Sequence, residues 1–297
     1  MTSTTLDRRG GPADALLHDY RSVLRRRNRT LLLGLLVVVA LTLLSGWVAQ
    51  VAPTRLAQHI GTFFGYFDRI TQLENAAPGT RVWTDPANWF WGLRKWSLLL
   101  ADTLLMAYVG TLLGAAGAFV LSFVAARNLV SQGWLRGAAK RLLEFCRTVP
   151  DIVFALIFVI AFGLGPLPGV LALAIHSLGS LGKLFTEVAE NIDMRPVEGA
   201  RAAGAPWAAA VRFGAVPQVL PNFASYTLLR FEINLRQASV LGFVGAGGIG
   251  QDLLEAIRKF YYNDVSAILL MIIVAVMLLD MLTEKVRHRL IGTEARR

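Results

Sequence analysis

The sequence has little cysteine, few charged residues and none of the common nucleotide-binding loops. Cys146 is the only cysteine among 297 residues, so no intrachain disulfide can form, and we expect it to be a small core residue. The four histidines (His18, His59, His176 and His288) are dispersed without metal-ligand spacing, so no metal site is expected. No GxxxxGK(S/T) loop is present, so we expect no catalytic residues and no cofactor on this chain.

Charged residues make up only 17% of the chain, whereas about a quarter is typical of soluble domains. Hydrophobic residues make up 55%, and the mean hydropathy is +0.51. This composition places the chain in a bilayer. The net charge of +10 comes from bases spread over separate connections, which argues against nucleic-acid binding.

Long apolar segments identify the membrane spans, because about 20 helical residues cross a hydrocarbon core of about 30 Å. The sequence predicts an all-α, polytopic membrane protein with about six transmembrane helices. They are expected at residues 30–49, 97–125, 149–164, 169–190, 218–242 and 265–283. The third segment is short and bounded by glycine and proline, and the fifth contains charges.

The distribution of lysine and arginine predicts the orientation, because basic residues are retained on the cytoplasmic side. With both termini in the cytoplasm, twenty basic residues lie inside and seven outside. The predicted divisions are a cytoplasmic basic tail (1–29), a first span with an external aromatic-rich segment (30–96), a core (97–290) containing a cytoplasmic loop (191–217), and a short cytoplasmic tail (291–297). Segment 30–49 is too long for a typical secretory signal, so we expect a retained anchor helix.

The cytoplasmic loop contains a polar, Ala/Gly-rich run, VEGARAAGAPWAAAVRFGAVP, at residues 197–217. Pro196 predicts the start of a short helix, Gly204 a bend, and residues 207–213 a second short helix. The run resembles the cytoplasmic coupling loop of ABC-importer permeases, with Gly199 and Gly214 departing from the usual residues. The positions that the resemblance assigns to contact with the ATPase are Glu198, Gly199, Ala200, Arg201, Gly204 and Pro217.

Two further blocks strengthen this resemblance: Arg-Thr-Val-Pro at 147–150, and NLRQASVLGFVGAGGIG at 234–250. Together they resemble the permease subunit of phosphonate importers, in the methionine-importer-like branch of type I ABC permeases. The resemblance implies an inner-membrane location, a second copy of the permease, two cytoplasmic ATPase subunits that bind ATP and Mg, and an external phosphonate-binding protein. The cargo is then a phosphonate, phosphate or phosphite. The alternatives are a permease of the same fold for methionine or another small solute, and a membrane scaffold without transport.

Polar residues in the fifth segment suggest a substrate pathway, because such groups are costly at membrane depth. Helical spacing pairs Arg230 with Asn234 and Glu232 with Arg236, and the second pair is predicted to be an ion pair near the outer boundary. We assign Arg230, Asn234 and Arg236 to the pathway, because an arginine suits an oxyanion. The alternative for Arg230 is packing with an acidic residue such as Glu232 or Glu187.

Two other features complete the predictions for the core. Lys183 and Glu187 are expected to form a local salt bridge at i and i+4. The glycines at 245, 247, 248 and 250 (Gly245, Gly247, Gly248 and Gly250) are assigned to an outer gate, as tight turns and close helix approaches rather than an anion-binding nest.

Aromatic residues are concentrated between residues 51 and 96, in the predicted external segment. Such rings favour the boundary between lipid and water, so membrane lipids are the expected partner. The alternative is a docking surface for an external binding protein.

Overall fold

The computed structural model describes residues 12–50, 53–73 and 79–292, and these residues form helices with a single isolated β-bridge between Gln72 and Arg81. The all-α prediction is confirmed. The chain divides into two compact units, residues 1–65 and 66–297, which are described separately.

The first unit contains α1 (Pro12–Val48) and most of α2 (Pro53–Ile70). Within α1, the segment Val23–Val48 is long and apolar enough to cross a membrane, and none of its most apolar window is buried in protein. This confirms the first predicted span. Exposed leucines such as Leu32 and Leu43 suit a helix surrounded by lipid.

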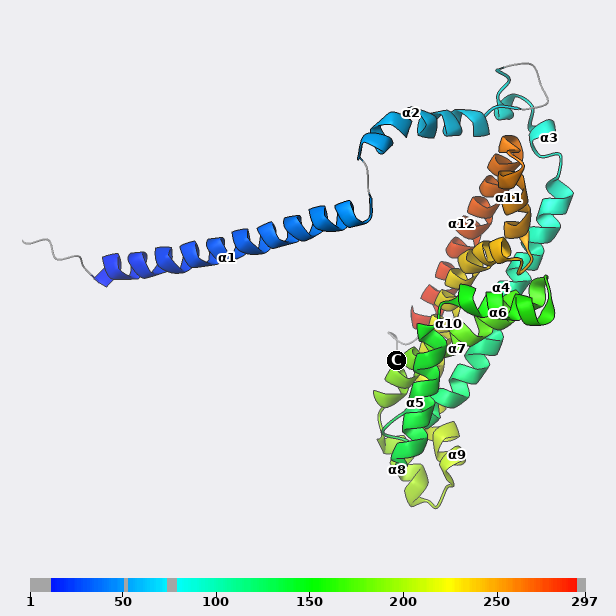
Figure 1. Ribbon diagram of the computed structural model, residues 1–297. Coiled ribbons are helices and arrows are strands. Elements are labelled where there is room, and N and C mark those ends of the chain that lie inside the picture. Colours follow the sequence, from blue (N-terminus) through cyan, green and yellow to red (C-terminus); the bar gives the residue numbers. More distant parts are fainter. Residues whose placement is uncertain (1–11, 51–52, 74–78, 293–297) are drawn as a thin grey trace, which may run out of the picture. The chain divides into compact units, whose positions relative to one another are not determined.

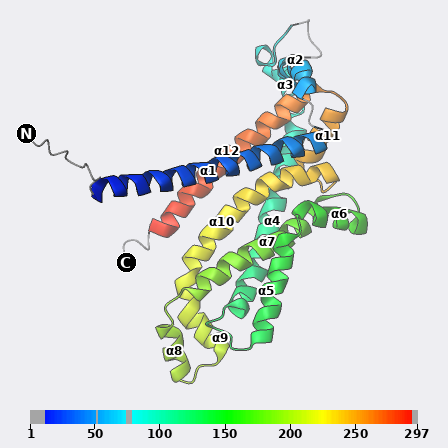
Figure 2. The same cartoon turned by 60° about the vertical axis from the view of Figure 1, so that its left-hand side comes forward.

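The second unit is built around α4 (Leu93–Ala125), α7 (Pro166–Glu190) and α10 (Val216–Leu241). These helices lie side by side in Figures 1 and 2, with α12 (Tyr262–Gly292) against α10. Aromatic rings join them: Phe185 of α7 and Phe223 of α10 stack with centroids 3.9 Å apart, and Phe123 of α4 lies beside Phe223. The helices α4, α7 and α12 confirm three more predicted spans.

The third predicted span, 149–164, is wrong as a single helix. The chain instead forms α5 (Gly133–Thr148) and α6 (Asp151–Phe162), which meet at an angle of 86°. The bend falls at Val149, because the residue before Pro150 is disfavoured in a helical conformation. The 12 residues of α6 give a length of about 18 Å, too short for a span, so only the bent pair together is long enough.

This bend bears on the charge count behind the predicted orientation, because α5 leaves the cytoplasmic connection when the bent pair counts as one span. Four basic residues assigned to the cytoplasmic connection lie on α5: Arg136, Lys140, Arg141 and Arg147. The orientation of the termini therefore stays a prediction, carried by the tails and by the loop at 191–217.

The fifth span is also part of a bent pair. The run from Trp207 to Val244 meets α11 (Ile249–Arg258) at 48°, through a turn that contains the predicted gate glycines. Four helices of the described chain are long and apolar enough to cross a membrane, or up to six when each bent pair counts as one span.

The segment that leads into α4 holds α3 (Pro86–Trp89) against the beginning of α12. Trp96 is 2% exposed and packs in a cluster with α11 and α12, and the Trp89 indole donates to Ser266 at 2.9 Å. These two rings therefore lie in protein, whereas Trp83 and Trp91 are exposed. The aromatic-rich segment thus does not have a single environment.

Candidate functional site

The polar loop folds as two short helices, as predicted. The first, α8, spans Arg195–Ala202, and the second begins with α9 (Trp207–Ala210) and continues as a π-helix over Val211–Ala215. Between them Gly204 adopts a φ of +83°, the left-handed conformation that glycine permits. The amide of Ala205 donates to the Ala200 carbonyl at 3.0 Å and closes the turn. We call residues 195–215 the coupling segment.

The beginning of α8 is held by an acidic side chain. Asp193 accepts hydrogen bonds from the Arg195 amide at 3.0 Å and from the Arg195 guanidinium at 2.6 Å. These bonds lower the pKa of the Asp193 carboxyl below its ordinary value. Glu198 and Gly199 follow on the exposed surface of α8, where another protein can reach them.

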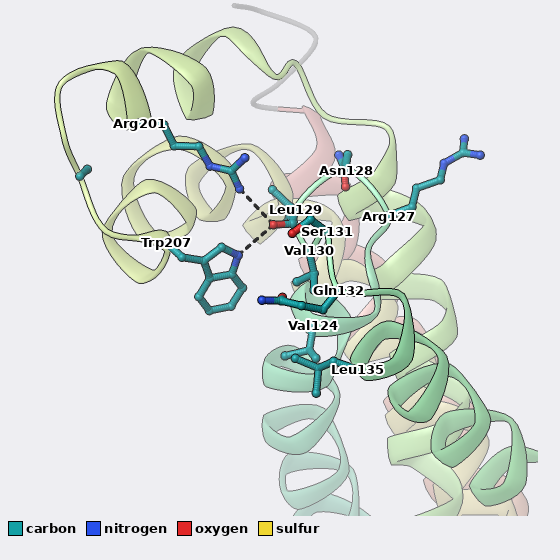
Figure 3. Close-up of a pocket in the computed structure, with 11 residues that line it drawn as sticks. Val124, Arg127, Asn128, Leu129, Val130, Ser131, Gln132, Leu135, Arg201 and Trp207 are labelled. Atoms are coloured by element: carbon teal, nitrogen blue, oxygen red, sulfur yellow. Dashed lines mark hydrogen bonds between the residues drawn. The ribbon is translucent and has the colours of Figure 1, made fainter.

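A single backbone carbonyl ties the coupling segment to the connection between α4 and α5. The Leu129 carbonyl accepts from Arg201 Nη2 and from Trp207 Nε1, each at 3.0 Å, as the dashed lines in Figure 3 show. Beside this contact is an open pocket of about 660 Å³. It is lined by residues of the connection, such as Arg127 and Gln132, and by Arg201 and Trp207 of the coupling segment. Arg201 is therefore engaged within the chain as well as exposed.

Close packing fastens the coupling segment to the ends of the long helices. Val197 of α8 is completely buried, and a Cβ on Gly214 would lie only 2.9 Å from the backbone of Val197. This contact explains why glycine stands at 214, where an aliphatic residue is usual. Val197 belongs to a buried cluster that also contains Phe185 of α7 and Phe223 of α10. The coupling segment is thereby packed directly against these two helices.

Glu190, the last residue of α7, holds the same connection from the other side. It accepts from the Arg127 amide at 3.0 Å and from Lys140 Nζ of α5 at 3.0 Å. The predicted pair of Lys183 and Glu187 is confirmed, at 3.8 Å.

A buried polar cluster joins α4, α7 and α10. Asn234 Nδ2 donates to Ser177 Oγ at 2.7 Å and to Thr111 Oγ1 at 2.8 Å, while Arg230 Nε donates to Ser177 Oγ at 3.1 Å. Arg230 is 8% exposed, and its Nη2 donates to Gln237 Oε1 at 3.3 Å. In the described part of the chain no salt bridge joins Arg230 to Glu232 or Glu187, the two acidic partners considered for it, and the carboxylate that acts on it is that of Asp151, farther than 4.0 Å away.

The bend between α5 and α6 brings further polar groups to this cluster. His176 Nδ1 lies 3.1 Å from the Val149 carbonyl, and Asp151 at the start of α6 interacts electrostatically with both His176 and Arg230. Sequence reasoning missed His176 and Asp151. The bend at Pro150 places Asp151 near Arg230, whereas His176 lies there because it directly precedes Ser177 on α7.

The predicted ion pair between Glu232 and Arg236 is wrong. Arg236 pairs with Asp280 of α12 at 3.2 Å, and Glu232 accepts a hydrogen bond from Thr283. Asp280 directly follows the apolar run of α12, and Arg236 lies five residues before the end of α10.

The glycine run forms a tight, buried turn, as predicted. Gly245, Gly247 and Gly248 all have positive φ, and a Cβ on Gly250 would collide with the Ser239 carbonyl. The Ile249 amide donates to Thr103 Oγ1 at 2.9 Å, so at least this amide is already bonded within the protein. Whether the turn acts as a gate stays a prediction.

No group of three metal-ligating side chains occurs among the residues that the structure describes. The features of this molecule are instead a coupling segment fastened to long helices and a buried cationic cluster between those helices.

Comparisons with known proteins agree with this arrangement. Residues 118–290 match the family described as binding-protein-dependent transport system inner membrane component. The phosphite transport system permease protein PtxC of Stutzerimonas stutzeri is 46% identical over 191 residues, which cover 64% of this chain and 70% of that protein. The phosphate-import permease protein PhnE of Mycolicibacterium smegmatis is 38% identical over 250 residues, 84% of this chain but only 44% of that longer protein.

The fold is similar to that of an inward-facing MetNI methionine ABC transporter, with a TM-score of 0.56 and 18% identity over 69% of this chain and 98% of that one. At this identity the similarity shows the fold alone, a type I ABC importer permease. The chain therefore belongs to the family of inner-membrane permease components of binding-protein-dependent transport systems.

Proposed function

We propose that this chain is the permease subunit of an ATP-driven importer for a phosphonate or a related phosphorus oxyanion, such as phosphite or phosphate. The relatives named as phosphite and phosphate permeases support this class of cargo. The observation that carries the proposal is the buried guanidinium of Arg230, which hydrogen-bonds only to neutral groups in the described chain.

A buried cation that no carboxylate contacts directly is costly and usually serves function. Several N–H donors of arginine match the oxygens of a phosphorus oxyanion, and an anion passing the cluster adds to the partial compensation that the more distant Asp151 supplies. Asn234 supports this site because its hydrogen bond holds Ser177 in place. Arg236 follows Arg230 on the same helix and pairs with Asp280. Asn234 and Arg236 thus stay predicted residues of the pathway.

The proposed assembly contains two copies of this permease, two ATPase subunits and an external binding protein. The ATPases bind ATP and Mg and contact the coupling segment through Glu198, Gly199, Ala200 and Arg201. Gly204 supplies the bend, and Pro217 starts the helix that carries movement to Arg230. Both termini and the coupling segment lie on the cytoplasmic side. Closure of the ATPases then changes which side of the membrane the cluster faces.

The test is ATPase stimulation of the reconstituted permease, ATPase and binding protein by 2-aminoethylphosphonate, phosphite, phosphate or methionine. For the wild type we expect stimulation by phosphorus oxyanions and none by methionine. Arg230→Met preserves much of the side-chain volume but removes hydrogen bonds to a charged ligand, each worth about 1.5–3 kcal/mol, so we expect stimulation to weaken at least tenfold.

Two controls separate cargo from fold. Arg230→Lys keeps the charge and should retain part of the stimulation. Arg236→Met removes a second arginine from the same helix, and its effect should be smaller because Asp280 already compensates that charge. Stimulation by methionine alone would contradict the proposed cargo, and full stimulation in Arg230→Met would assign this arginine a structural role.

A further inference from the structure

The helix α2 has two different faces. Its apolar residues recur at positions 56, 60, 63, 64, 67 and 70, which form one stripe when each residue turns the helix by about 100°. Of these side chains, Ile60 is 51% exposed and Phe64 is 66% exposed. Thr62, two residues from Phe64, lies on the opposite face together with Gln58 and Arg69.

The polar side of the last turn makes contacts with protein. Asp68 accepts from Arg81 at 2.7 Å and from Gln72 at 2.6 Å, and the guanidinium carbon of Arg69 is 5.8 Å from the centre of the Tyr262 ring. These contacts fix the polar side of this turn and leave the apolar stripe exposed at Phe64.

The position of α2 in the chain limits where it can lie. The candidate span in α1 ends at Val48, and four residues separate it from Pro53. Four connecting residues extend at most about 18 Å, so the beginning of α2 stays within that distance of the membrane surface where α1 ends. With its polar face, α2 is not among the helices apolar enough to cross. A helix tethered at the surface, with one aromatic face and one polar face, is stable in the plane of the interface.

We propose that α2 is an interfacial helix that lies in the plane of the membrane, with Ile60 and Phe64 in the lipid and Thr62 in water. The partner is the lipid of the leaflet where α1 ends, the external leaflet in the predicted orientation. This inference does not depend on the cargo. The competing partner, an external binding protein, would also cover the aromatic stripe but only when that protein is bound.

The native chain makes a sharp test possible, because its only cysteine, Cys146, is 5% exposed. In a Cys146→Ala background, Phe64→Cys and Thr62→Cys would each carry a nitroxide label. The labelled permease would be measured in proteoliposomes as its complex with the ATPase. Collision of the label with oxygen, which concentrates in lipid, is compared with collision with a water-soluble nickel chelate. We expect oxygen to exceed nickel several-fold at position 64 and the reverse at position 62, without the binding protein.

Equal access of nickel to both positions would overturn the proposal, as would protection of position 64 that appears only when the binding protein is added. Ile60→Cys provides a second site on the apolar stripe if Phe64→Cys fails to assemble, and it should give the same result as position 64. ATPase activity of each labelled complex shows that it has assembled, so a failure of this inference is distinguishable from a failure of the proposed transport function.

Discussion

Replacement of Trp207 by phenylalanine tests whether the Leu129 carbonyl fastens the coupling segment. The change keeps an aromatic ring but removes the indole N–H that donates to this carbonyl at 3.0 Å. The carbonyl retains Arg201 as a donor, and the adjoining pocket admits water, so no buried acceptor is left unsatisfied. The loss is then that of one ordinary hydrogen bond, about 1 kcal/mol.

A loss of about 1 kcal/mol raises the population of locally open states about fivefold. We therefore expect amide hydrogen exchange in residues 195–215 to accelerate by about that factor, while exchange in the middle of α4 and α7 stays unchanged. If the coupling segment transmits ATPase closure to the long helices, the number of cargo molecules transported per ATP should also fall. The reason is that a loosened segment can move without moving the helices.

Trp134→Phe is the matched control. Trp134 lies on α5, near the same connection, and is 76% exposed, so the identical chemical change there should leave both exchange and transport unchanged. The reasoning is refuted if Trp207→Phe behaves like Trp134→Phe. It is also refuted if exchange accelerates equally over the whole chain, which would indicate general destabilisation.

Three other outcomes follow from the structure. Gly179→Ala puts a Cβ 2.4 Å from a backbone atom of α5, so we expect a cost of about 1–3 kcal/mol, seen as a lower unfolding temperature in detergent, whereas Gly137→Ala on open α5 surface should have no such effect. Arg236→Asp should reduce the yield of folded permease, and adding Asp280→Arg should restore it, because the pair is re-formed with its charges exchanged. Because the pKa of Asp193 is lowered, its bonds at the start of α8 are complete at neutral pH and are lost only as the pH falls below about 4 towards the lowered pKa. The protection of the first α8 amides, measured relative to the intrinsic exchange rate at each pH, should therefore fall in that range and stay constant between about pH 5 and 7.

The coupling segment could be predicted from sequence because its signals are local. Proline at 196 fixes the local backbone and glycine at 204 permits a left-handed turn, and both short helices lie where these residues place them. The third span was predicted wrongly although a local signal was present. Pro150 disfavours a helical conformation at Val149, and the apolar run after it concealed that this helix is long enough for a span only together with the helix before it.

The partners of α10 could not be predicted by spacing alone. The i and i+4 rule shows which residues share a face of one helix, but it contains no information about the neighbouring helix. Arg236 lies opposite Asp280, forty-four residues later, and that contact replaces the expected one with Glu232. Thr111 was equally hidden, because a threonine in an apolar helix commonly bonds to its own backbone, as Thr111 does to the Ala107 carbonyl at 2.6 Å.

The cluster around Asn234 indicates which parts of the permease move together. Asn234 of α10 donates to both Thr111 of α4 and Ser177 of α7, at 2.8 and 2.7 Å. A slide of α10 by about 1 Å would break both bonds and leave buried polar groups unsatisfied, at about 1–3 kcal/mol each. Sliding within the group of α4, α7 and α10 is therefore disfavoured, and we expect the three to rotate as one body. Changes of shape are then expected between this group of three helices and the helices around it, rather than within the group.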